Sequence, residues 1–180
     1  MTTSFTMLPP ESRLHGYMKP GDFIDCVETN PIDPNLSISA LARQLMASKP
    51  SWMPALLALR DALVAPFGVK TTQDILTSEA ALSNSSQSKA STDLTSGDYV
   101  SFFRVQEVHE SEIILGEDDR HLNFRITLFK PEPASGRIFL ATWVHRNNLM
   151  GRIYLTAIMP FHKAIVFQMA KGLSHKPKVS

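Results

Sequence analysis

Apolar and polar residues alternate over much of the second half of the chain. Between residues 121 and 128 the even positions are leucine, phenylalanine or isoleucine, and the odd positions are all polar. A period of two is typical of a β-strand with one buried face. Similar patterns predict strands at 22–28, 99–109, 112–115, 121–129 and 137–145. Because the links between the last four are short, they are expected to pair as an antiparallel meander.

Three other segments have helical spacing. Apolar residues recur three to four positions apart after Ser37, which is a suitable N-cap, and again from Ser51 until Pro66 and Gly68 end the pattern. These two segments predict a helical hairpin after the first strand. A long helix is predicted from Leu149 to Lys171, with a kink at Pro160 because proline removes a backbone donor.

The remaining segments carry little apolar sequence. Residues 77–97 are rich in serine and are interpreted as a mobile loop, residues 1–20 as a flexible N-terminal arm and residues 172–180 as a C-terminal tail. The rest predicts one α+β domain spanning residues 1–180. A curved antiparallel sheet would grip the long C-terminal helix, leaving a cavity between them.

Composition narrows the functional classes. A formal net charge of +1 gives no electrostatic reason to expect a nucleic-acid partner. The single cysteine, Cys26, excludes an internal disulfide, and we expect a cytoplasmic protein in which Cys26 is a small buried residue. Arg152, His162 and Lys163 interrupt the apolar run from residue 149 to 169, so we expect a buried helix and no membrane span.

The chain lacks the common sequence motifs of cofactor sites and hydrolytic centres. The chain has no GxGxxG, P-loop, GxSxG or HExxH motif, so no cofactor is expected. The acidic run from Glu117 to Asp119 has no recognised metal-ligand spacing and is interpreted as a hairpin turn, with Asp119 pairing with Arg120 or Arg125. No metal site is expected there.

Four stretches resemble an uncharacterised bacterial family, domain of unknown function 2867. They are KPSWMPALLALRDALVAPFGVKT (49–71), LGEDDRHLNFRI (115–126), LATWVHRNNLMGRIYL (140–155) and IMPFHKAIV (158–166). The predicted order of elements is also similar to the START and Bet v 1-like (SRPBCC) superfamily, whose helix-grip fold holds small hydrophobic ligands. This resemblance implies a cavity between the sheet and the last helix, and it implies no particular reaction.

The candidate site residues lie on the meander and the last helix. Arg125 suits a carboxylate or phosphate because its guanidinium offers two parallel donors. His121, Asn123 and Arg125 would orient a ligand if their strand face lined the cavity, but the same row could be the solvated outer face of the sheet. The candidate ligand-binding residues are Asp119, His121, Asn123, Arg125, Trp143, His145, Arg152 and His162.

The junction between the last strand and the long helix is a further candidate. Asn147 or Asn148 is expected to cap the helix. Gly151, in the first turn, is expected to permit a close approach of another backbone, because glycine otherwise weakens a helix. Free backbone donors beside Arg152 would suit an anion, and an ordinary asparagine cap is the alternative.

Three functions remain open at this point. The first is binding of a small, mostly hydrophobic molecule with a polar or anionic head. The second is an enzyme in the same cavity, with His121 or His162 as acid–base and Asp119 as its orienting partner, or with His121, His145 and His162 converging on zinc. The third is an interaction or structural domain without a ligand.

Overall fold

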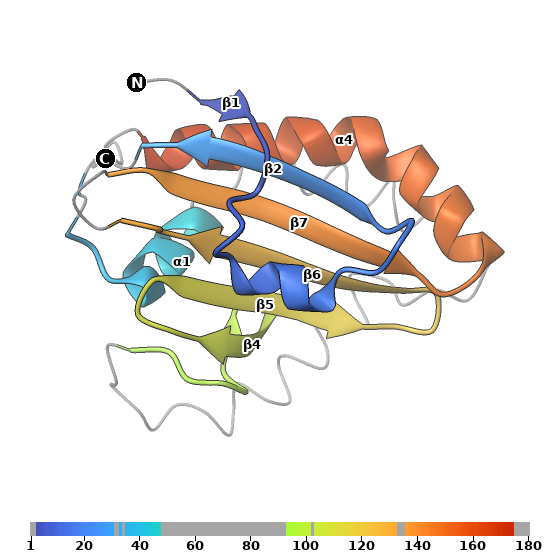
Figure 1. The fold of residues 1–180 in the computed structure, drawn as a ribbon, viewed down its shortest axis with the longest axis horizontal. Coiled ribbons are helices and arrows are strands. Elements are labelled where there is room, and N and C mark those ends of the chain that lie inside the picture. Colours follow the sequence, from blue (N-terminus) through green and yellow to red (C-terminus); the bar gives the residue numbers. More distant parts are fainter. Residues whose placement is uncertain are drawn as a thin grey trace.

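The computed structural model describes residues 3–30, 33, 35–47, 93–101, 103–132 and 136–174. These residues form an α+β domain with a curved antiparallel sheet and a long C-terminal helix, an arrangement consistent with a helix-grip fold (Figure 1). The elements are β1 (Ser4–Phe5), η1 (Arg13–Tyr17), β2 (Phe23–Thr29), α1 (Ile38–Ala47), β3 (Tyr99–Val100), β4 (Phe103–Val108), β5 (Glu112–Asp118), β6 (Leu122–Phe129), β7 (Ile138–Arg146) and α4 (Leu149–Leu173).

The sheet has seven strands in the order β1-β2-β7-β6-β5-β4-β3. Strands β4 to β7 form the expected antiparallel meander, and β2 adds to its end by pairing antiparallel with β7. Asp25 lies directly opposite Thr142, and Arg125 lies directly opposite Trp143. The pairing of β2 with β7 therefore places segments from both ends of the chain side by side in the sheet.

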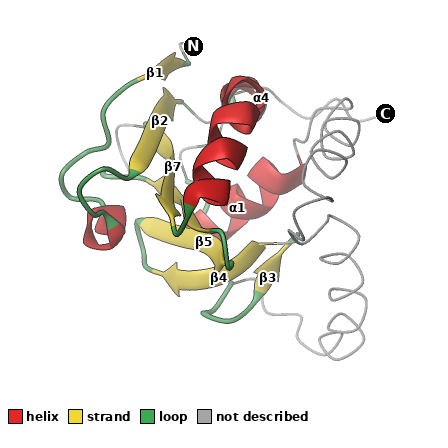
Figure 2. Cartoon of the chain, turned by 90° about the vertical axis from the view of Figure 1, so that its right-hand side faces the viewer, coloured by secondary structure: helices red, strands yellow, loops and turns green. Residues whose placement is uncertain are grey.

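Helices α1 and α4 cover one face of the sheet (Figure 2). The alternating apolar residues of β6 and β7 point to this helix face, as the strand pattern predicts. Leu41 and Leu45 of α1 and Ala170 of α4 are almost completely buried there. Burial of apolar side chains in this layer is the main stabilising contribution to the fold.

The opposite face of the sheet is covered by the N-terminal segment, and we call it the outer face. Leu14 of η1 is fully buried against Phe129, Phe139 and Trp143. Residues 1–20 were expected to form a flexible arm, but from Ser4 onward this segment pairs with β2 and packs on the sheet. The difference arises because its few apolar side chains meet apolar residues that the meander presents on its second face.

Other boundaries also differ from expectation. The strand expected at 99–109 is divided, because Ser101 adopts a left-handed backbone conformation with a φ of 59°. Leu94, in the Ser-rich segment 77–97, is buried, and its backbone N–H donates to Ser39 Oγ. The second helix of the expected hairpin and the rest of that segment lie outside the described residues. Ser174, in the expected tail, is buried and its hydroxyl lies 2.6 Å from Thr29 Oγ1.

Helix α4 runs without interruption through Pro160 and is only partly buried. Leu155 and Val166 face the sheet, whereas Leu149 and Ile153 are exposed. Within the described part of the chain, α4 is the one helix with the length and composition to cross a bilayer, which is weak evidence because sheet-packed helices share those properties. It contacts α1, β2 and β7.

Candidate functional site

A groove of about 440 Å³ lies between α4 and the adjacent ends of β2 and β7. It is open to solvent, and most of its lining is apolar. Its residues are Phe23 from β2, Arg146 from β7, and Leu155, Thr156, Met159, Pro160 and Lys163 from α4. The groove is large enough for a small organic ligand.

Two cationic side chains, Arg146 and Lys163, line this otherwise apolar groove. Within the described residues neither of them makes an ion pair, although Arg146 donates one hydrogen bond to the carbonyl of Gly21. An apolar groove with unpaired cations favours an amphipathic ligand with an anionic end.

His162 lies beside the groove, where it pairs with a carboxylate of β2. Its Nε2 is 3.0 Å from Asp25 Oδ2, and its ring contacts the edge of Phe23 at a centroid distance of 6.1 Å. His162 was a candidate from the sequence, but Asp25 was missed. The sequence signal that could have identified Asp25 is its position, because it shares one face of β2 with the apolar residues Phe23 and Val27.

The polar row of β6 lies on the outer face, so it does not line the groove. Arg125 is 7% exposed and its Nη1 donates to Asp118 Oδ1 at 2.8 Å, whereas the sequence suggested Asp119 as the partner. The Tyr17 ring covers the guanidinium at 5.1 Å. Arg125 lies on the outer face, as one of the two sequence interpretations expected, but the N-terminal segment keeps it from solvent. Asn123, further along the same row, lies 3.0 Å from the side-chain amide of Asn147.

The expected cap of the long helix is confirmed. Asn148 is the N-cap of α4 and its Oδ1 accepts the backbone N–H of Gly151 at 3.0 Å. His121 is buried at this junction, with Nδ1 3.3 Å from Asn148 Oδ1. The ordinary cap therefore already uses the backbone donor that an anion would need. Arg152, the residue after Gly151, is exposed to solvent.

Trp143 and His145 share a partner on the outer face, the carboxylate of Asp22. Trp143 Nε1 donates to Asp22 Oδ2 at 2.8 Å, and His145 Nδ1 lies 2.6 Å from Asp22 Oδ1. Burial raises the pKa of Asp22, but hydrogen bonds from His145, the Lys19 backbone and Trp143 together outweigh it, so the pKa lies below its ordinary value. This cluster fixes the turn before β2 and does not face the groove.

The lowered pKa of Asp22 gives a pH-dependent contribution to stability. A carboxyl whose pKa is lower in the folded state stabilises the fold above its unfolded pKa of about 3.9, and that stabilisation is lost as the pH falls through the folded pKa. Asp22→Asn should therefore reduce the free energy of unfolding at neutral pH, and the difference from wild type should shrink below about pH 4. Urea unfolding across a pH series measures this. A difference that stays constant into strong acid would contradict the assignment.

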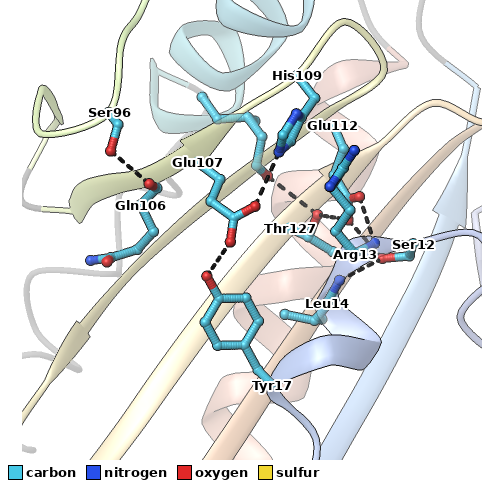
Figure 3. Close-up of polar contacts among 11 residues, drawn as sticks. Ser12, Arg13, Leu14, Tyr17, Ser96, Gln106, Glu107, His109, Glu112 and Thr127 are labelled. Atoms are coloured by element: carbon cyan, nitrogen blue, oxygen red, sulfur yellow. Dashed lines mark hydrogen bonds and ion pairs between the residues drawn. The ribbon is translucent and has the colours of Figure 1, made fainter.

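A second polar cluster, missed from the sequence, joins the N-terminal segment to the outer face (Figure 3). Glu112 is 1% exposed and accepts hydrogen bonds from Ser12 Oγ at 2.6 Å, Arg13 N at 2.8 Å and Thr127 Oγ1 at 2.7 Å. Tyr17 donates to Glu107, and this bond together with His109 lowers the pKa of Glu107. The contacts of this cluster join distant parts of the chain, and its role is to hold the segment in place.

The convergence of three histidines, one of the possibilities left open by the sequence, is not found among the described residues. His121 lies at the start of α4, His145 on the outer face and His162 on the helix face, and among the described residues no three metal-binding side chains come together. Asp119 lies in a turn in which its Oδ1 accepts the Arg120 N–H, and it hydrogen-bonds to neither histidine of the enzyme hypothesis. The structure therefore does not bring Asp119 together with either histidine as that hypothesis requires.

Comparison with known proteins gives one match. The profile of the family described as "Protein of unknown function (DUF2867)" matches residues 19–169, which is most of the chain. Comparisons with curated proteins and with solved structures found no match. The matched region includes β2, the meander, the groove and nearly all of α4, and it begins after η1. The chain therefore belongs to the protein family of unknown function DUF2867.

Proposed function

We propose that this is a cytoplasmic protein that binds a small, mostly hydrophobic ligand with an anionic head between the sheet and the C-terminal helix. The observation that carries the proposal is the groove, which is apolar along Phe23, Leu155 and Met159. It is also lined by two cations, Arg146 and Lys163, that form no ion pair with any described residue. Apolar contact supplies affinity in such sites, and a few charged groups supply orientation.

The head-binding residues differ from those that the sequence suggested. Arg125 and His145 are engaged on the outer face, and Arg152 is exposed and does not line the groove. We propose instead that Arg146 binds the anionic head, because it lies at the end of β7 and lines the groove. Its guanidinium keeps donors that the single bond to Gly21 does not use.

The order of elements supports the same proposal by analogy. A curved antiparallel sheet that packs on a long C-terminal helix is similar to the START and Bet v 1-like superfamily. In that superfamily the space between the sheet and the helix takes hydrophobic ligands. The likeness raises the expectation of a ligand and gives no information about its identity.

Decanoate is a suitable probe because it combines an apolar chain with a carboxylate. Calorimetry should detect decanoate binding, and Arg146→Gln should weaken it about tenfold by removing a charge-assisted contact. Arg152→Gln is the matched control, since Arg152 is an exposed arginine outside the groove, and it should leave the affinity unchanged.

A second variant tests the place of binding. Thr156 is exposed on the groove wall, so Thr156→Trp should fill the groove and abolish decanoate binding without lowering the melting temperature. Binding that survives Thr156→Trp and falls equally in Arg146→Gln and Arg152→Gln would reflect surface charge and would reject the groove as the site.

A further inference from the structure

Two buried polar atoms beneath α4 have no hydrogen-bond partner among the residues that the structure describes. Asp25 and Thr142 lie directly opposite each other on β2 and β7 and point to the helix face. The Asp25 side chain is 7% exposed and Thr142 is 4% exposed. Asp25 Oδ1 and Thr142 Oγ1 both lack a partner. Because an unpaired buried polar atom destabilises a protein, two of them at one cross-strand position indicate a place for a polar group.

His162 determines which oxygen of Asp25 is free. Its Nε2 lies 3.0 Å from Oδ2, so the carboxylate is held on one side by the helix while Oδ1 remains unpaired. Directly opposite residues on paired strands have Cβ atoms about 5 Å apart. A single small group can therefore contact both Asp25 Oδ1 and Thr142 Oγ1.

Asp25 and Thr142 do not line the groove, but each shares a strand face with a residue that does. Phe23 lines the groove, contacts the His162 ring and lies two residues from Asp25 on the same face of β2. Along β7, Thr142 and Arg146 share the helix face and are separated by about 13 Å of extended strand. A ligand with its anionic end at Arg146 and a chain about as long as decanoate can reach this pair.

The chemistry of the pair selects a hydroxyl group. A hydroxyl donates to Asp25 Oδ1 and accepts from Thr142 Oγ1, so it satisfies both atoms at once. An ammonium group only donates, so it would leave the hydroxyl proton of Thr142 without an acceptor. We propose, on the basis of the proposed function, that Asp25 and Thr142 form a subsite for a hydroxyl group, which makes the ligand a hydroxylated amphipathic acid.

The test compares ω-hydroxydecanoate with decanoate by calorimetry on the full chain. Wild-type protein should bind the hydroxy acid about tenfold more tightly, because a hydrogen bond to a charged acceptor is gained. Thr142→Val, which keeps the side-chain shape, should reduce this preference because the ligand hydroxyl loses one of its two partners, and it should bind decanoate as wild type does. Thr142→Ser keeps the hydroxyl and should retain the preference, and Asp25→Asn should reduce it.

The outcomes separate this inference from the proposed function. Equal binding of the two acids to wild-type protein overturns the hydroxyl subsite and leaves groove binding intact. A preference that persists in both Thr142→Val and Asp25→Asn also overturns it. Tighter binding of ω-aminodecanoate than of the hydroxy acid would assign the pair to a cation instead. If neither decanoate nor the hydroxy acid binds, the proposed function fails, and the subsite fails with it.

Discussion

Replacing Gly151 with alanine should destabilise the protein by about 2–3 kcal/mol, although alanine is the better helix former. A Cβ at Gly151 would lie 2.1 Å from the carbonyl oxygen of His121 and 3.1 Å from its carbonyl carbon. Both are backbone atoms, and the same carbonyl accepts the N–H of Asn147 at 3.0 Å. Relief of the clash must therefore move the start of α4 away from the sheet or break that bond.

Urea unfolding gives the free energy for this comparison, with Gly16→Ala as the matched control. An added Cβ at Gly16 meets no atom within 4 Å. That substitution should change stability by no more than about 0.5 kcal/mol. If Gly151→Ala is as stable as wild type, the close packing of α4 on the end of β6 is wrong.

Replacing Glu112 with alanine should cost about 3 kcal/mol of stability. The variant leaves the hydroxyls of Ser12 and Thr127 and the backbone N–H of Arg13 without their acceptor in a region closed to water. Because these contacts join η1 to β5 and β6, the variant should also release the N-terminal segment. Trypsin cleavage after Arg13 should become faster, while cleavage elsewhere should follow global stability.

Glu117→Ala is the control, since Glu117 is an exposed carboxylate on the same strand. It should change neither the unfolding midpoint nor the rate of cleavage at Arg13. Equal effects of the two substitutions would mean that the charge of β5, and not the buried acceptor, determines stability.

The regular elements of this fold are largely readable from the sequence. The period of two in β6 correctly predicts that Phe124, Ile126 and Leu128 share the buried helix face and that Arg125 lies opposite. The Asn148 cap and the close approach at Gly151 are confirmed for the same reason, since local spacing carries both signals. These features depend on residues that are close together in the sequence, so the local pattern is sufficient to predict them.

Long-range contacts explain the errors. The segment containing η1 has only isolated apolar residues, so nothing local indicates that Leu14 is fully buried by the sheet. The sequence left open whether the polar row faced the cavity or solvent, and it could not show that Tyr17, more than a hundred residues away in the chain, covers Arg125. Asp25 was overlooked because a carboxylate in a strand usually faces solvent.

The family match and the packed structure have different boundaries. The match begins at residue 19. Leu8, Leu14 and Tyr17 precede that residue in the sequence, but they pack on Phe129, Phe139 and Trp143. A chain truncated to the matched region would expose these aromatic rings to water as a continuous apolar patch, which favours aggregation. Any recombinant version should therefore keep the leading residues, and an affinity tag is better placed away from them.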